Sequence, residues 1–157
     1  MGTGCGVSAI LAARVSSDVV AVDINPKAVE CARENAKQNR VSRRITFLES
    51  DVFQRVEGNF DLIVFDPPFR WYTPRDPLEM STADESDGAL TRFMMQASQR
   101  PRPGGRVLLN FGTSGDIDYL EALIDRAGFN KESTPYGRVT KHGLVVDYFA
   151  IRLTNKI

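Results

Sequence analysis

Short β-branched runs alternate with helical patterns along this chain, and that alternation restricts its possible folds most. The segment SDVVAVDI at 17–24 has the apolar, β-branched character of a buried parallel strand. Asn25 and Pro26 follow as a helix cap and a first-turn proline, and 27–39 repeats apolar residues at helical spacing. We therefore expect an α/β protein in which helices cover both faces of a parallel sheet.

The rest of the chain continues this pattern. We predict strands at 44–51, 60–66 and 106–112, helices at about 90–97 and 115–127, an irregular stretch at 67–86 and a turn at 101–105. Ser114 is expected to cap the helix 115–127, and Gly128 to end it with a positive φ. The strands 129–138 and 144–153 should form an antiparallel hairpin. These elements predict a doubly wound, Rossmann-like sheet, mostly parallel, in a single domain over residues 1–157.

Composition narrows the possible functions. The chain has 157 residues, with 20 basic and 20 acidic side chains and a formal net charge of zero, whereas proteins that hold long nucleic acids through phosphates are usually more basic. The longest apolar runs are strand-sized, and no apolar leader segment is evident, so we expect a cytoplasmic protein without a membrane partner. Cys5 and Cys31 lack metal-ligand spacing and are expected as small core thiols, so we predict no metal site.

Polar groups and glycines recur where the predicted strands end. GTGCG at 2–6 leads directly into an apolar helical segment, an arrangement that lets backbone approach a ligand but also suits a plain tight turn. Asp23 ends the next strand, at the spacing expected for a carboxylate that binds ribose hydroxyls; its alternative role is to cap the helix that follows. Asp51 ends another strand and could equally be a solvated loop acid. Together they indicate a ligand at the carboxyl edge of the sheet.

The segments GTGCG, VVAVDINPKAVECARENAKQN and FDLIVFDPPF resemble the class I S-adenosylmethionine-dependent methyltransferases. The branch that they resemble most includes the HemK-like release-factor glutamine methyltransferases and the small-domain RNA methyltransferases. This resemblance covers nearly the whole chain and implies S-adenosyl-L-methionine as the cofactor. By this resemblance, the methionine end of the cofactor would be lined by Gly2, Thr3, Gly4 and Gly6. Asp23 and Ile24 would hold the ribose, and Asp51 and Val52 the adenine. A dinucleotide oxidoreductase is the competing interpretation, but the glycine spacing is GxGxG rather than GxGxxG.

The DPPF corner, Asp66 to Phe69, supplies the predicted catalytic residues. In the family that the chain resembles, this motif holds a planar amino nitrogen, whose lone pair is delocalised and therefore poorly nucleophilic. The Asp66 carboxylate and the Pro67 carbonyl would accept the two N–H bonds and aim the lone pair at the methyl donor. Pro68 would help to fix the carbonyl direction, and the Phe69 ring would stack on the substrate. The competing interpretation is an ordinary strand terminator with a surface phenylalanine.

These features predict an N-methyltransferase, with a protein glutamine amide as the expected substrate. An exocyclic amine of an RNA or DNA base is the alternative, because the glutamine enzymes favour asparagine where this chain has Asp66. A non-catalytic relic or partner subunit that only binds cofactor is the third possibility. Substrate choice could lie in the segment 70–88, where Arg70, Trp71, Tyr72 and Arg75 could stack on RNA or close over the cofactor. His142 is expected to be a solvated turn residue.

Only Met1 precedes the glycine loop, although such a loop normally follows a central strand. We therefore expect that the first strand is missing and that this chain is N-terminally truncated. The gap that this leaves in the sheet could be closed by neighbouring strands that move together, or by a strand from a second copy in a homo-oligomer.

Overall fold

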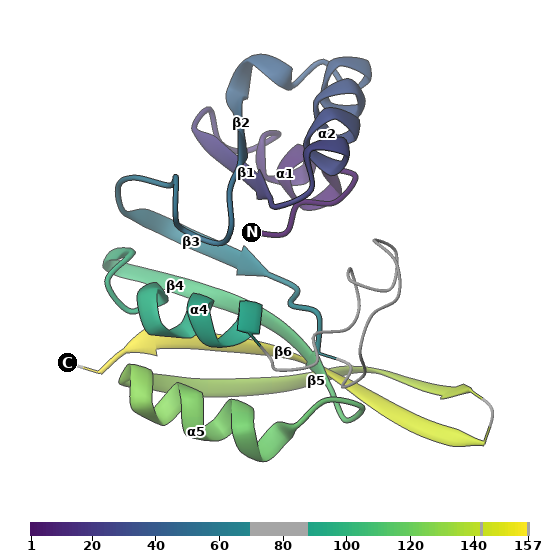
Figure 1. Ribbon diagram of the computed structural model, residues 1–157, viewed down its shortest axis with the longest axis vertical. Helices are drawn as coiled ribbons and strands as arrows, with labels where there is room; N and C mark the ends of the chain where they lie inside the picture. Colours follow the sequence, from purple (N-terminus) through teal and green to yellow (C-terminus); the bar gives the residue numbers. More distant parts are fainter. Residues whose placement is uncertain (70–87, 142, 157) are drawn as a thin grey trace. The chain divides into compact units, whose positions relative to one another are not determined.

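The computed structural model describes residues 1–69, 88–141 and 143–156. The chain divides into two compact units, Met1–Glu57 and Gly58–Ile157 (Figure 1). Each unit combines helices with a sheet that contains a parallel strand pair, so the expected α/β class is confirmed.

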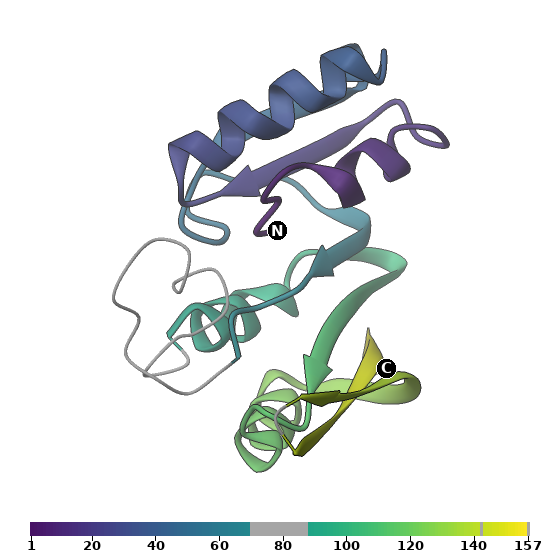
Figure 2. The same cartoon turned by 90° about the vertical axis from the view of Figure 1, so that its right-hand side faces the viewer.

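The first unit is a two-stranded parallel sheet covered by helices (Figure 2). Its elements in chain order are α1 (Val7–Ala12), β1 (Val19–Asp23), α2 (Pro26–Gln38), a 3₁₀ turn η1 (Ser42–Arg44) and β2 (Ile45–Glu49). As predicted, the Asn25 side chain caps α2 by accepting from the Lys27 N–H at 3.0 Å, and Pro26 occupies the first turn. The apolar faces of both helices meet the strands in one core, made by Ala9, Ile10, Ala13, Ala21, Ala36, Val41 and Ile45.

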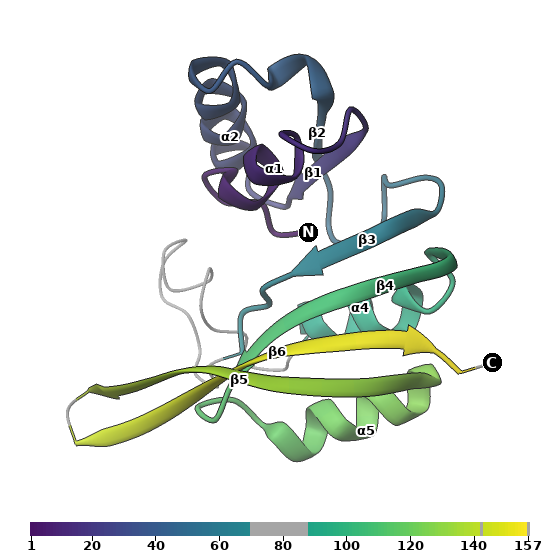
Figure 3. The ribbon, with the colours of Figure 1, turned by 180° about the vertical axis from the view of Figure 1, so that it is seen from behind.

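The second unit is a four-stranded mixed sheet in the order β3-β4-β6-β5. Its elements are β3 (Phe60–Phe65), α4 (Gly88–Ala97), β4 (Pro101–Gly112), α5 (Ile117–Ala127), β5 (Phe129–Lys141) and β6 (Leu144–Asn155). β3 and β4 are parallel, and β6 runs antiparallel to both of its neighbours, so the predicted hairpin is confirmed. α4 and α5 contact each other and lie on one face of the sheet (Figures 1 and 3). The Phe65 and Phe93 rings, 4.5 Å apart, join β3 to α4.

Three local expectations are corrected by the structure. The cap of α5 is Asp116, whose carboxylate accepts from the Tyr119 N–H at 2.8 Å, rather than Ser114. The segment 101–105 is not a free turn, because β4 already begins at Pro101; a register shift and a positive φ of 77° at Gly104 mark its irregular start. Cys5 and Cys31 are exposed rather than buried in the core. Gly128 does end α5 with a φ of 75°, as predicted.

The strands form two separate sheets where the sequence suggests one. Residues 1–6 form no strand, and the described strands belong to one sheet in each unit. β1 pairs only with β2, and β3 pairs only with β4, among the strands that the structure describes. Each of these two strands therefore keeps one edge of backbone N–H and C=O groups without a strand partner there.

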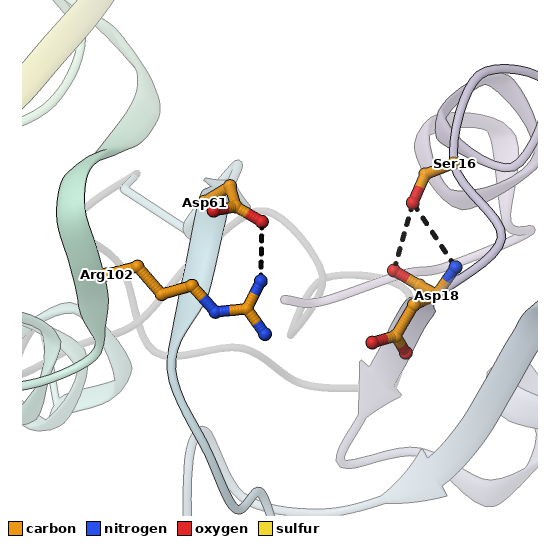
Figure 4. A network of polar contacts seen from close by, with 4 residues as sticks. All are labelled: Ser16, Asp18, Asp61 and Arg102. Carbon is orange, nitrogen blue, oxygen red and sulfur yellow. Dashed lines mark hydrogen bonds and ion pairs between the residues drawn. The ribbon is translucent and has the colours of Figure 1, made fainter.

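Exposed polar contacts hold the starts of β1 and β3 (Figure 4). Before β1, the Ser16 hydroxyl accepts from the Asp18 N–H and donates to the Asp18 carbonyl, both at 3.2 Å. At the start of β3, Arg102 of β4 pairs with the Asp61 carboxylate at 2.7 Å. Because both side chains of this ion pair are more than half exposed, water and salt screen the charges and the pair contributes little stability.

None of the described helices is long and apolar enough to cross a membrane.

The packing of Gly6 against α2 yields a prediction for folding stability. Gly6 has a φ of 90°, and a Cβ built on it would lie 2.9 Å from the Cβ of Ala32, which is fully buried in α2. Gly6→Ala should therefore lower the free energy of unfolding by about 2–5 kcal/mol, the sum of left-handed strain and overpacking.

Gly4→Ala is the matched control for that measurement. Gly4 also has a positive φ, 53°, but an added Cβ meets no atom within 4 Å among the residues that the structure describes. In the Gly4→Ala variant, the free energy of unfolding should fall only by the cost of the left-handed backbone, about 1–2 kcal/mol. Urea unfolding followed by far-UV circular dichroism compares the two, and equal losses would show that Gly6 does not pack against Ala32 as described.

Candidate functional site

The glycine loop of the first unit is tied to the end of β1 by two hydrogen bonds. The Thr3 N–H donates to the Val22 carbonyl at 2.7 Å, and the Gly4 N–H donates to Asp23 Oδ2 at 2.8 Å. Gly2, Gly4 and Gly6 all have a positive φ, a backbone conformation that residues other than glycine rarely adopt. Glycine is therefore required here by the backbone path that brings the loop beside the strand end.

The Asp23 carboxylate is bound on both oxygens by backbone. Besides the bond from Gly4, Asp23 Oδ1 accepts from the Asn25 N–H at 3.0 Å, which is the helix-entry role considered as an alternative. The two roles are compatible, because a carboxylate has about four lone-pair positions and only two are used by these bonds. Asp23 is only half-buried, and the neighbouring Ile24 side chain is 59% exposed. Both can still contact a ligand.

Ser50 organises the turn that carries Asp51 and Val52. Its N–H donates to the Asp23 carbonyl at 2.9 Å, and its buried hydroxyl accepts from the Arg55 N–H at 2.9 Å and donates to the Val52 carbonyl at 3.2 Å. Val52 has a φ of 50°, a strained value for a β-branched residue that persists only when its surroundings enforce it. The sequence analysis missed Ser50, although a serine directly after an apolar strand was a signal for it.

The residues of the first unit fit S-adenosylmethionine. Among the described residues, no atom beyond the chain neighbours of Gly4 lies within 4 Å of a Cβ built on it, so the described protein leaves the loop backbone open to a ligand there. Asp23 keeps unused acceptor positions for ribose hydroxyls, and the strained turn at Val52 presents backbone near the same strand ends. The predicted cofactor residues of β1, β2 and the loop are thus brought together within one unit by parallel strand pairing.

The DPPF corner of the second unit begins where β3 ends. Phe65 pairs with Leu109 in the parallel β3–β4 register, so Asp66 and Asn110 follow side by side. The Asn110 side-chain N–H donates to Asp66 Oδ1 at 2.9 Å, whereas Asp66 Oδ2 has no hydrogen-bond partner within the described ranges. Asp66 is exposed by its accessible surface, but neighbouring protein removes part of the water around its carboxyl group. This desolvation raises the pKa of Asp66, and the bond from Asn110 opposes that rise because it stabilises the carboxylate.

Tyr136, on the edge strand β5, is a third member of this group. Its hydroxyl donates to Asn110 Oδ1, forming a chain from Tyr136 through Asn110 to Asp66. Tyr136 lies at a register shift in β5, and such bulges re-aim side chains. β6 lies between β4 and β5, and its residue paired with Asn110 is Ala150, a small residue. The sequence analysis missed both residues; the polar asparagine inside the apolar run LLNFG was the available signal.

The other residues of the corner are mostly buried. Pro67 is buried and Pro68 half-buried. Phe69 is only 9% exposed, and its ring lies 4.9 Å from that of Phe111, so packing within the unit uses most of its surface. The stacking of Phe69 on a substrate stays a prediction.

Several residues named from the sequence lie outside the described residues: Arg70, Trp71, Tyr72, Arg75 and His142. Within the described residues, no group of three or more His, Cys, Asp or Glu side chains is arranged to hold a metal ion.

Comparisons with known proteins identify the family of this chain. A family model described as "Methyltransferase small domain" matches residues 1–123. The release factor glutamine methyltransferase of Cereibacter sphaeroides is 30% identical over 145 residues, which cover 84% of this chain and 51% of that protein. The ribosomal protein uL3 glutamine methyltransferase of Neisseria meningitidis is 28% identical over 147 residues, covering 86% of this chain and 48% of that protein. The chain thus spans about half the length of these two relatives.

Solved structures show the same fold. A 16S rRNA methyltransferase of T. thermophilus, in complex with AdoMet and guanosine, matches with a TM-score of 0.74 and 20% identity, covering 99% of this chain and 36% of that one. A precorrin-6y C5,15-methyltransferase of Geobacter metallireducens matches with a TM-score of 0.70 and 17% identity, covering 99% of this chain and 78% of that one.

The glycine loop, the strand-end acids and the DPPF corner lie within the matched residues 1–123. The chain therefore belongs to the methyltransferase small-domain family of S-adenosylmethionine-dependent methyltransferases.

Proposed function

We propose that this chain is an N-methyltransferase that acts on a planar amino nitrogen, and that the substrate is a protein glutamine amide. The observation that carries the proposal is the state of Asp66, which ends β3 with one carboxylate oxygen bound by Asn110 and the other without a partner in the described residues. A single open acceptor beside the Pro67 carbonyl is what a planar N–H₂ group needs.

The proposed mechanism assigns each residue of the corner one task. Asp66 Oδ2 and the Pro67 carbonyl accept the two N–H bonds of the substrate, which turns the nitrogen lone pair out of the amide plane. When bound, S-adenosylmethionine supplies a methyl group whose bond to sulfur breaks as the bond to nitrogen forms. Methylation makes the nitrogen acidic, and Asp66 is the base that then takes its surplus proton. Gly2, Thr3, Gly4 and Gly6 would hold the methionine end; Asp23 and Ile24 the ribose; and Asp51 and Val52 the adenine.

The choice of a glutamine amide rests on sequence relatives. Two relatives named for glutamine methylation, of a release factor and of ribosomal protein uL3, align with more than four fifths of this chain. Their named substrates belong to the translation apparatus, which supports a cytoplasmic location. The family match runs from residue 1 to 123 and so includes parts of both units, which supports one methyltransferase domain across the chain.

Methylation of an exocyclic base amine is the second candidate. Asp66 favours it, because Asp offers acceptors only, whereas the glutamine enzymes that this chain resembles favour an asparagine at that position. Transfer of a tritiated methyl group from S-adenosylmethionine into separate protein, RNA and DNA fractions distinguishes the two candidates. Label in protein alone supports the glutamine proposal, and label in nucleic acid alone replaces it with the base amine.

A homo-oligomer that completes the sheets is a further part of the proposal. β1 and β3 each keep one edge without a strand partner among the described residues, and such edges pair readily with a strand from another chain. Light scattering after size exclusion tests this, and a monomer at all concentrations would exclude it.

Removal of the ribose acid should weaken cofactor binding. Asp23→Ala removes the acceptor for the proposed ribose bonds and also those of the Gly4 and Asn25 N–H groups. We expect a loss of about 3 kcal/mol or more in affinity for S-adenosylmethionine, roughly 100-fold, measured by isothermal titration calorimetry. Asp18→Ala, which changes an exposed acid before the other end of β1, should bind as the wild type does. Unchanged affinity in Asp23→Ala would move the cofactor site elsewhere, and no binding heat in the wild type at millimolar ligand would contradict the enzyme itself.

Removal of the Asp66 carboxylate should abolish turnover and spare cofactor binding. Asp66→Ala is expected to lower methyl transfer by about 100-fold or more at saturating cofactor, because one preorganised partner of the reacting nitrogen is lost. Asp61→Ala is the matched control: it removes an acid at the other end of β3 whose exposed pair with Arg102 contributes about 0–1 kcal/mol. Full activity in Asp66→Ala would remove this residue from the mechanism.

A further inference from the structure

The chain from Tyr136 through Asn110 to Asp66 has a fixed direction. An ionised carboxylate can only accept, so the Asn110 group that faces Asp66 must be its N–H₂. The Asn110 carbonyl oxygen then points away and accepts from the Tyr136 hydroxyl. The asparagine is thus held from both ends, and its donor side is committed to position 66.

This direction decides which side-chain type can work at position 66. Asp66 satisfies Asn110 with one oxygen and keeps a second oxygen for a substrate N–H. An asparagine at that position has one oxygen only. If that oxygen accepts from Asn110, the N–H₂ group of the asparagine at position 66 faces the substrate. Two N–H donors then face each other, and the substrate N–H has no acceptor.

We propose that Asn110 is a positioning residue that fixes which Asp66 oxygen is open to the substrate and thereby selects aspartate over asparagine at position 66. This rests on the proposed function, in which Asp66 accepts a substrate N–H. It gives the departure of this chain from the asparagine of the glutamine enzymes a local cause: the donor on the neighbouring strand, rather than a different substrate, demands the carboxylate.

Tyr136 has the supporting part in this arrangement. Its hydroxyl holds the carbonyl end of Asn110, and its ring lies 6.3 Å from that of Tyr148 on β6. Although Tyr136 is 59% exposed, desolvation of its hydroxyl raises the pKa of the phenol. The bond with Asn110 lowers that pKa, but the charges of Asp66 and Tyr148 raise it further, so the phenol keeps its proton and remains a donor.

Exchange of the two side chains tests the proposal. Asp66→Asn alone should lose about 100-fold or more in methyl transfer, because an N–H₂ then faces the substrate. Asn110→Asp alone should also be impaired, because two adjacent carboxylates repel and one of them takes up a proton. The double variant Asp66→Asn with Asn110→Asp reverses the donor and the acceptor. The introduced amide can then donate to the neighbouring carboxylate and turn its single oxygen to the substrate.

We expect the double variant to recover at least about tenfold over Asp66→Asn, a non-additivity that residues in direct contact show. Asn130→Asp on β5 is the control for added charge, since it places the same substitution on an exposed position outside this group, and it should be fully active. A double variant no more active than Asp66→Asn, in protein whose unfolding curve matches the wild type, would overturn the selection role. Full activity of Asp66→Ala would instead contradict the proposed function, so the two failures are distinguishable.

A second readout needs no substrate. Asn110 stabilises the ionised form of Asp66, so Asn110→Ala should raise the pKa of Asp66. The ¹³C shift of the Asp66 carboxyl carbon, assigned by its loss in Asp66→Asn, reports that pKa during a pH titration. The acid limb of the methyl-transfer profile should move to higher pH in the same variant. Tyr136→Phe should produce a smaller change in the same direction. An Asp66 pKa that is unchanged in folded Asn110→Ala would show that the amide does not act on the carboxylate.

Discussion

Parallel strand register is the constraint on which the candidate site depends. In the first unit, Asp23 pairs with Glu49, so the strand-end acid and the Ser50 turn follow side by side. In the second, Phe65 pairs with Leu109, which places Asp66 beside Asn110. Parallel strands bring their carboxyl ends to the same edge of a sheet, so residues far apart in sequence become neighbours there. A shift of one residue in either register would turn these polar side chains to the opposite face.

Two strand-end carboxylates in this chain have different surroundings, and the difference suits different tasks. Asp23 accepts a backbone N–H on each oxygen, from the glycine loop and from the entry to α2, so its carboxylate is held in one orientation. Asp66 accepts from a side chain on one oxygen only, and partial desolvation of its carboxyl group raises its pKa. An acceptor that is fixed in one orientation suits the recognition of hydroxyl groups. A carboxylate with an open oxygen and a raised pKa suits the transient handling of an amino proton.

The environment of Asp66 also bears on how the family motif should be interpreted in this chain. An aspartate at this position would, from the motif alone, suggest a base amine, whereas two relatives that align with 84% and 86% of this chain are named for glutamine methylation. The Asn110 donor offers a way to reconcile these observations. Asp66 uses one oxygen to accept from Asn110 and keeps the other open, and an asparagine that has no such donor beside it also keeps one oxygen open. Motif letters describe a site only together with the groups that hydrogen-bond to them.

The sequence by itself determined the α/β class, most element positions, the cap at Asn25, the left-handed Gly128 and the family, because these depend on local hydrophobic periodicity, proline and glycine geometry and short motifs. It could not give the cap at Asp116, since Ser114 and Asp116 are both good caps and only the backbone path chooses between them. Nor could it find Ser50, Asn110 or Tyr136 as parts of the site. Tyr136 lies 26 positions from Asn110, and Asn110 lies 44 from Asp66. Only strand pairing and a bulge in β5 bring these side chains within hydrogen-bonding distance. These contacts join residues far apart in sequence, so no local sequence pattern predicts them.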